Sequence, residues 1–305
     1  MKFLYKESLL LLLLVAPVCT LHADEKNVDC NKKSLQSEID KLNKEEFNVV
    51  TISGVCTEDI VVSEFTNLTL IGTTGAGITA TAFLPVDIGN STVAVLVENS
   101  KVTLETLTIN AGSQGVSCRK RSTCTIRNAT IQGGWSGLFF QDQSAGDILG
   151  STTIQNSLGN GLGIFGASTV NVRPEPFEGQ GEVGPVISGH ADSFGGGFGV
   201  FMGDGSFLRT DNVTISGNDT GVYAQRDTYV RILGGEVSGS AFDGIIVKDG
   251  STAQIRTDIS NNVGTGVFVG PLTFAQIVSS FSGNGSDVVC SHPTSISSPP
   301  TLCGN

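Results

Sequence analysis

The chain has 305 residues, of which 39 % are hydrophobic and 15 % are charged, with 39 glycines and a formal net charge of −11 at pH 7. Because the balance is acidic, nucleic acids and anionic membrane surfaces are excluded as expected partners. The same charge disfavours direct binding of a polyanion unless a cation bridges the two.

Residues 1–23 have the features of a secretory signal peptide. Lys2 and Lys6 precede the apolar stretch from Leu9 to Val18, and the small residue Ala23 stands before acidic residues. The stretch is too short to span a bilayer as a stable helix, so we expect no transmembrane anchor. Cleavage near Ala23 would leave 16 basic and 28 acidic residues. The mature protein is expected to be secreted, at the cell surface or in the periplasm.

Six of the seven cysteines follow the signal peptide, and an even number in an oxidising compartment indicates disulfides. They form three local couples: Cys30/Cys56, Cys118/Cys124 and Cys290/Cys303. None of these spacings is typical of a zinc site, and only His190 and His292 remain in the mature chain. The sequence therefore predicts structural bridges, no metal site and no cofactor.

A helix is predicted over residues 34–47. Leu35, Ile39 and Leu42 have helical spacing, and Ser34 is placed to cap the N-terminus. This helix would close the N-terminal end of the fold, with Cys30/Cys56 tying it to the residues that follow.

One pattern then recurs seven times: a glycine, an aliphatic residue, five further residues, and Ser or Thr. The instances are Gly115/Ser122, Gly137/Ser144, Gly161/Ser168, Gly199/Ser206, Gly221/Thr228, Gly244/Ser251 and Gly266/Thr273. Counted at the Ser or Thr, the steps are 22, 24, 38, 22, 23 and 22 residues. A period of this length predicts stacked structural repeats.

Within each repeat the first and third residues after the glycine are apolar, which predicts a strand with one buried face. The first column is Val116, Leu138, Leu162, Val200, Val222, Ile245 and Val267, and the third is Cys118, Phe140, Ile164, Met202, Ala224, Val247 and Val269. A further apolar column marks another strand at Ile109, Ile131, Ile154, Ile187, Ile215, Val237, Ile259 and Phe281. Several strands per coil predict an all-β, right-handed parallel β-helix with about 22 residues per coil. A leucine-rich repeat has a similar period, but its leucine ladder and helices are absent from the sequence.

The domain organisation follows from this repeat. Residues 24–305 form a single β-helix domain, with the N-terminal cap and first coil at 24–56, the coils at 57–289 and a disulfide-closed tail at 290–305. Prolines in the tail cannot continue the strands.

The segment from Cys30 to Cys56, together with residues 67–72 (Asn-Leu-Thr-Leu-Ile-Gly), resembles the start of secreted bacterial β-helix proteins of the pectin-lyase-like superfamily. The resemblance covers nearly the whole mature chain. It implies the fold, whereas the superfamily's activities include lyases, hydrolases, epimerases, esterases and non-catalytic surface proteins. The catalytic motifs of its polygalacturonase-like and pectate-lyase-like members do not occur here, so no catalytic residue is carried over.

A column of turn residues stands two positions before each repeat Ser or Thr: Lys120, Asp142, Gly166, Asp204, Arg226, Asp249 and Pro271. Asp204 and Asp249 suggest calcium, but Arg226 stands between them, which favours a ladder of alternating charge over a metal site.

The second position after each repeat glycine faces outward by the same alternation, yet it is often aromatic. We predict ligand binding by Phe139, Phe201, Tyr223 and Phe268, because sugar rings stack on aromatic faces. The alternative is that a loop or a second copy of the chain covers this stripe.

The 38-residue step from Ser168 to Ser206 carries about 16 extra residues, in segments 173–185 and 190–197. Insertions into a solenoid often carry function. We expect these segments to wall a groove floored by Phe201 and Tyr223, with Arg173 among the ligand-binding residues. If the protein is an enzyme, its acid and base are drawn from Glu175, Glu178, Glu182, His190 and Asp192.

The favoured function is non-catalytic binding of a glycan or another partner through the aromatic stripe and the expanded coil. The alternatives are a polysaccharide lyase or glycoside hydrolase, and a structural surface protein that buries the stripe in a homo-oligomer.

Overall fold

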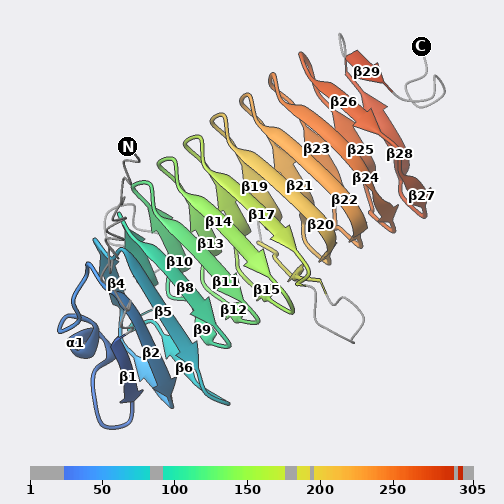
Figure 1. Cartoon of the computed structure of the whole chain (residues 1–305). Helices are drawn as coiled ribbons and strands as arrows, with labels where there is room; N and C mark the ends of the chain where they lie inside the picture. Colours follow the sequence, from blue (N-terminus) through green and yellow to red (C-terminus); the bar gives the residue numbers. More distant parts are fainter. Residues whose placement is uncertain (1–23, 83–91, 176–183, 193–195, 292–294, 298–305) are drawn as a thin grey trace, which may run out of the picture.

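The computed structural model describes residues 24–82, 92–175, 184–192, 196–291 and 295–297. The predicted architecture is confirmed: the chain winds as a right-handed parallel β-solenoid of about 11 turns, with about 22 residues per coil (Figure 1). The predicted signal peptide, 1–23, lies outside the described residues.

One sheet contains a single strand from each of ten coils. Its strands are β4 (Ile60–Ser63), β7 (Val93–Glu98), β10 (Gln114–Arg119), β13 (Ser136–Phe140), β16 (Asn160–Ile164), β19 (Phe198–Met202), β21 (Thr220–Ala224), β23 (Ile245–Val247), β25 (Thr265–Val269) and β28 (Ser286–Cys290). Each strand pairs in parallel with its counterpart in the next coil.

A nineteen-stranded sheet forms the rest of the wall, with two rows of strands. The first row contains β1 (Asp24–Asp29), β2 (Phe47–Ser53), β5 (Asn67–Gly72), β8 (Lys101–Glu105), β11 (Thr123–Arg127), β14 (Ala145–Leu149), β17 (Thr169–Arg173), β26 (Phe274–Ile277) and β29 (Ser295–Ser297). The second row contains β3 (Val55–Thr57), β6 (Gly77–Thr79), β9 (Thr108–Asn110), β12 (Thr130–Gln132), β15 (Thr153–Gln155), β18 (Val186–Ser188) and β27 (Ser280–Ser282). Three long strands run through both rows: β20 (Phe207–Ser216), β22 (Tyr229–Ser238) and β24 (Thr252–Ser260).

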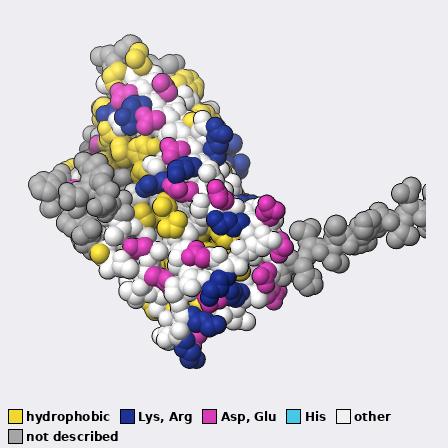
Figure 2. Space-filling model, turned by 90° about the vertical axis from the view of Figure 1, so that its left-hand side faces the viewer, with side chains coloured by type: hydrophobic (Ala, Val, Ile, Leu, Met, Phe, Trp, Pro, Cys, Tyr) yellow, Lys and Arg dark blue, Asp and Glu magenta, His cyan; other side chains and the backbone are white. Residues whose placement is uncertain are grey.

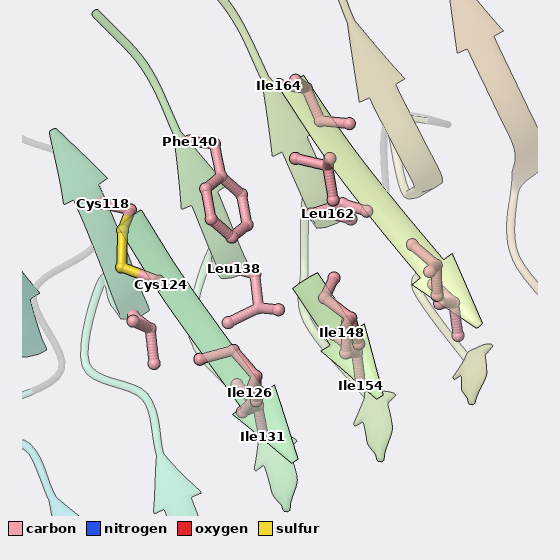
Figure 3. Close-up of a cluster of buried hydrophobic side chains, with 14 of the residues drawn as sticks. Cys118, Cys124, Ile126, Ile131, Leu138, Phe140, Ile148, Ile154, Leu162 and Ile164 are labelled. Atoms are coloured by element: carbon pink, nitrogen blue, oxygen red, sulfur yellow. A yellow bond between two sulfur atoms is a disulfide. The ribbon is translucent and has the colours of Figure 1, made fainter. Parts of the chain in front are cut away.

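The predicted inward columns fill the space between the sheets. Every residue of the columns that begin at Val116 and Cys118 is at most 1 % exposed. Figure 3 shows side chains of both sheets, including Leu138, Phe140 and Ile148, meeting in this interior. Burial of aliphatic side chains contributes about 25 cal/mol per Å² of apolar surface, so this continuous core is the main source of stability.

The repeat glycine is required by the close approach of neighbouring coils. A Cβ added to Gly137 would lie 2.8 Å from the carbonyl oxygen of Gly161, and one added to Gly161 would lie 2.7 Å from that of Gly199. Since any larger residue would push the next coil away, the glycine recurs at the same place in successive coils.

The predicted helix over 34–47 is too long. The helix α1 contains only Leu35–Ile39, and Phe47 already belongs to β2. The Asn43 side chain accepts a hydrogen bond from the Glu45 amide at 3.2 Å, a local turn that competes with a helical backbone. The Ser34 cap is confirmed, because its hydroxyl accepts from the Ser37 amide.

Two predicted disulfides are confirmed. Cys30 bonds to Cys56 near α1, and Cys118 bonds to Cys124 inside the solenoid, where both residues are fully buried (Figure 3). Cys303 of the third predicted pair lies outside the described residues.

The expanded coil keeps the register of its neighbours. β17 pairs with β14 and β20, β18 pairs with β15 and β20, and β16 pairs with β19. In the chain, the extra residues therefore fall between β17 and β18 and between β18 and β19.

Candidate functional site

Five aromatic side chains form a continuous group on the outer face of the ten-stranded sheet, which we call the aromatic cluster: Phe139, Phe165, Phe198, Phe201 and Tyr223. Consecutive ring centroids lie 5.1 to 5.3 Å apart, from Phe139 through Phe165 and Phe201 to Tyr223, with Phe198 against both Phe201 and Tyr223. All five side chains are partly exposed.

Strand alternation and register place these rings together. Phe139 pairs with Gly163, Gly163 with Phe201, and Phe201 with Tyr223, so one outward column crosses β13, β16, β19 and β21. Phe165 follows the inward Ile164 of β16 and is therefore at an outward position. Phe198 begins β19, and its ring lies against those of Phe201 and Tyr223 although strict alternation from the inward Val200 predicts an inward side chain. The sequence prediction followed one position per repeat and therefore missed both; alternation identifies Phe165 but not Phe198.

A glycine allows the Phe139 ring to lie over the neighbouring strand. A Cβ on Gly163 would lie 2.6 Å from Cδ2 of Phe139. The Phe139 ring occupies the space above this glycine and covers the sheet. A covering ring presents part of its face to solvent, which is the geometry that stacking requires.

A lysine lies at one end of the cluster. Lys248 Nζ is 5.0 Å from the centroid of the Tyr223 ring, a cation–π distance. A hydrogen bond with the Tyr223 hydroxyl raises the pKa of Lys248. A positive charge therefore borders the rings at neutral pH.

Phe268 lies further along the same outward column and is separated from Tyr223 by Ile246. It is partly exposed. The predicted stripe therefore consists of the aromatic cluster followed by an aliphatic and an aromatic position.

His190 does not face the cluster. It is fully buried, where Nδ1 accepts from the Ser157 amide at 3.1 Å and Nε2 lies 3.1 Å from the Ile154 carbonyl oxygen. Since Nδ1 is an acceptor, Nε2 carries the proton and donates to that carbonyl. Burial lowers the pKa of His190 to about 4, so the imidazole is neutral at pH 7.

This arrangement is one step of a polar ladder through successive coils: Ser157, His190, Asn218, Ser240, Asn262 and Asn284. Asn218 Oδ1 accepts from the His190 amide, and Asn262 Oδ1 accepts from the Ser240 amide. Asn284 makes both bonds that His190 makes: it accepts from the Asn262 amide and donates to the Ile259 carbonyl. His190 therefore occupies the position that asparagine or serine has in other coils. Both of its ring nitrogens make structural hydrogen bonds in the ladder, so no catalytic role is needed to explain them.

Of the other acid/base candidates, the structure describes Glu175 and Asp192, and neither makes a hydrogen bond with the His190 ring. Glu175 follows β17 at the corner between the two rows of the nineteen-stranded sheet, where it pairs with Arg127 at 2.9 Å. Glu178 and Glu182 lie outside the described residues. Asp192 lies in the other inserted segment, and its amide donates to Asp219 at 2.9 Å.

Asp219, which the sequence reading did not single out, anchors that inserted segment. Its carboxylate accepts from the amides of Asp192 and Gly197 at 2.9 and 3.0 Å, and its own amide donates to the His190 carbonyl. Asp192 and Gly197 are thus held near the start of β19, next to Phe198.

The predicted groove is only partly within the described residues. Arg173 is exposed at the end of β17, and Pro185 directly precedes β18; both strands belong to the nineteen-stranded sheet. In the other predicted wall, Gly197 directly precedes Phe198 of the aromatic cluster. Residues 176–183 and 193–195 lie outside the described residues, so the groove remains a prediction.

The charged turn column forms ion pairs between coils. Arg226 Nε lies 3.0 Å from Asp204, and Lys120 Nζ lies 2.7 Å from Glu98. The part of the chain that the structure describes contains no group of three or more His, Cys, Asp or Glu residues placed to hold a metal ion.

No helix among the described residues is long and apolar enough to cross a membrane.

Comparison with known proteins identifies the fold. The family model for the right handed beta helix region matches residues 42–196. Among solved structures, the crystal structure of pectate lyase Pel9A is similar with a TM-score of 0.52 and 11 % sequence identity, over 94 % of this chain and 80 % of that one. No curated protein sequence matches. At this identity the similarity concerns the fold alone.

Proposed function

Because the chain belongs to the right-handed β-helix family, whose fold alone specifies no activity, we propose that it is a secreted, non-catalytic protein that binds a neutral glycan on the aromatic cluster. The observation that carries the proposal is the contiguity of the five rings on one exposed sheet face. The two disulfides and the signal-like segment at 1–23 support secretion.

Rings on parallel strands suit a chain of sugars. Paired strands are about 4.8 Å apart, so the four strands from β13 to β21 provide a row of rings about 14 Å long. Stacking on each ring contributes on the order of 1 kcal/mol, which gives a modest affinity that rises with the number of rings covered.

The charge distribution favours a neutral ligand. The mature chain is acidic, which opposes a polyanion approaching from solution. Basic and acidic side chains are interspersed on the face seen in Figure 2, so no large field of one sign covers it. Recognition then depends on stacking and on hydroxyl hydrogen bonds.

Among the described acid/base candidates, the positions of Glu175 and His190 support binding over cleavage. A glycosidase needs two carboxyl groups on either side of the scissile bond. Glu175 is paired with Arg127 at another corner of the coil, and His190 is enclosed in the polar ladder.

The test uses the double variant Phe201→Ala/Tyr223→Ala and isothermal titration with soluble neutral glucan, mannan and galactan, and with polygalacturonate as the acidic comparison. The variant is expected to fold and to lose binding, because both rings lie outside the core. The matched control is Phe207→Ala/Tyr229→Ala, which removes a stacked ring pair (centroids 5.3 Å apart) from the nineteen-stranded sheet. This control should bind like the unmodified protein.

Equal affinity of the Phe201→Ala/Tyr223→Ala variant and the unmodified protein would contradict the proposal. Release of oligosaccharide products would identify an enzyme instead. A dimer in sedimentation that dissociates only when these two rings are removed, without glycan binding, would assign the cluster to a second copy of the chain.

A further inference from the structure

A polar pocket lies at the corner of the solenoid next to the aromatic cluster. Its volume is about 570 Å³. The residues that line it are Asn99, Lys120, Arg121, Asp142, Gln143 and Gly166. They belong to the turns that lead from the ten-stranded sheet to the nineteen-stranded sheet in successive coils. Because Phe165 of the aromatic cluster directly precedes Gly166, the pocket continues the ring surface around this corner.

The turns hold four long or polar side chains in a conformation that favours glycine. The φ angles are +54° at Lys120, +62° at Arg121, +59° at Asp142 and +62° at Gln143. A left-handed backbone costs a non-glycine residue roughly 1 kcal/mol. The corresponding turns at Gly166, Gly205 and Gly250 have one glycine each, beside the left-handed Ala167, Asp204 and Asp249, whereas the turn at Arg226 and Asp227 has none. The turns at Lys120/Arg121 and Asp142/Gln143, like the one at Arg226/Asp227, therefore bear a conformational penalty at both positions that glycine would avoid.

The backbone of the pocket is firmly held. The Arg121 amide donates to the Asp142 carbonyl at 3.0 Å, and the Gln143 amide donates to the Gly166 carbonyl at 2.8 Å. The Cys118–Cys124 disulfide joins the strands on either side of the Lys120 and Arg121 turn. A cross-link and inter-coil hydrogen bonds preorganise the groups that the turn presents.

The side chains offer unused hydrogen-bonding capacity with almost balanced charge. Lys120 is neutralised by Glu98 at 2.7 Å, and Arg121 Nε donates to Gln143 Oε1 at 3.2 Å. Among the described residues, Asp142 has no hydrogen-bond or ion-pair partner for its carboxylate. A carboxylate, amides and a guanidinium side by side can accept from and donate to adjacent sugar hydroxyls.

We propose that this corner pocket is a second subsite for the same neutral glycan, in which Asp142, Arg121 and Gln143 bind the hydroxyls of a sugar unit beyond those stacked on the aromatic cluster. The inference rests on the proposed function and extends it from a stacking surface to a site that selects long chains. Short oligosaccharides occupy the rings, and only longer ones reach around the corner.

The test replaces two of the four left-handed residues with glycine, one from each turn, in the variant Arg121→Gly/Asp142→Gly. Glycine suits the backbone, so the melting temperature should remain equal or rise. Titration uses gluco-, manno- and galacto-oligosaccharides of two to six units. For the series that binds, the affinity of the hexasaccharide should fall at least about tenfold, the effect of losing a charged hydrogen bond, and that of the disaccharide should not change.

The matched control is Arg226→Gly/Asp227→Gly, which removes two side chains with φ of +59° and +58° at the same corner of a later coil. It should leave the affinity of every oligosaccharide unchanged. A hexasaccharide affinity that is the same in Arg121→Gly/Asp142→Gly as in the unmodified protein would overturn this inference, as would an equal loss in the control. If Phe201→Ala/Tyr223→Ala abolishes binding in that case, the proposed function stands without the second subsite. If that ring variant binds normally, the proposed function itself fails.

Discussion

At the scale of single residues, His190 is a titratable side chain at a position of the polar ladder where other coils use the side-chain amide of asparagine to bond to the preceding coil. An asparagine in the polar ladder presents one acceptor and one donor to the preceding coil, as Asn284 does to Asn262 and Ile259. A neutral imidazole with its proton on Nε2 presents the same pair to Ser157 and Ile154. The histidine differs in one respect: protonation turns its acceptor into a second donor, which faces the Ser157 amide.

This geometry predicts a pH-dependent contribution to stability. The pKa of His190 is about 4 in the folded protein and 6.5 in the unfolded chain, so the unfolded chain binds the proton first. The free energy of unfolding therefore falls as the pH is lowered from 6.5 towards 4, by at most about 3 kcal/mol from this residue. Guanidinium denaturation at pH 7 and pH 4.5, compared between the unmodified protein and His190→Asn, measures it.

His190→Asn should retain stability at pH 7 to within about 1 kcal/mol, because asparagine makes the same two hydrogen bonds. His190→Leu should lose about 2 to 4 kcal/mol, since it leaves the Ser157 amide and the Ile154 carbonyl unpaired in the core. If His190→Asn shows the same loss of stability on acidification as the unmodified protein, the carboxylates and not His190 account for that loss.

At the scale of elements, α1 is too short to be stable alone and depends on a residue from the following coil. A helix of five residues lies far below the length that forms in water. Glu58 provides hydrogen-bond acceptors for the first amides of the helix. Its carboxylate accepts from the Leu35 amide at 2.6 Å, the Gln36 amide at 3.2 Å and the Ser34 hydroxyl at 2.7 Å. A negative charge at a helix N-terminus is further stabilised by the unpaired amides there.

We predict that Glu58→Ala loosens α1 and lowers stability by about 1 to 2 kcal/mol, the usual effect of removing a helix cap. Hydrogen exchange of the amides of residues 35–39 should accelerate while exchange in β13 to β21 stays the same. Glu64→Ala is the control, because its pair with Lys44 is longer, at 3.7 Å, and exposed. Equal exchange of residues 35–39 in Glu58→Ala and the unmodified protein would show that packing alone holds the helix.

At the scale of the whole molecule, each coil contacts mainly its two neighbours, so local stability depends on how well each coil is covered. Central inward residues such as Leu162 and Val200 are fully buried, whereas Phe281 and Val288 in the last described coil are only partly buried. The ends of the stack are therefore expected to open more readily than its centre.

Hydrogen exchange followed by mass spectrometry should show this gradient, with β27 and β28 exchanging first and β16, β19 and β21 last. Addition of glycan that binds the aromatic cluster should slow exchange in the central strands only. Uniform exchange along all coils would indicate a single cooperative unit instead.

Much of this architecture could be predicted from the sequence because each coil repeats the same physical requirements. The glycine column, the inward aliphatic columns and the disulfides follow from local spacing alone. His190 was misread because histidine attracts a catalytic interpretation, although it stands three residues after the inward Ile187, as Asn218 does after Ile215. The position of Arg173 relative to the aromatic cluster could not be predicted, because residue spacing does not say to which sheet the strand before an insertion belongs. The corner pocket combines side chains from several coils, which no single repeat reveals.

The expanded coil keeps its register while it carries about 16 extra residues. Lengthening a loop costs only about 0.6 kcal/mol for each doubling, and the paired strands on either side remain unchanged. The corners of the solenoid can therefore accept insertions independently of one another. A foreign peptide grafted between β17 and β18 would be displayed away from the aromatic cluster, and one grafted between β18 and β19 would lie beside it. Insertions at these corners can add new surface features during evolution while the core residues stay the same.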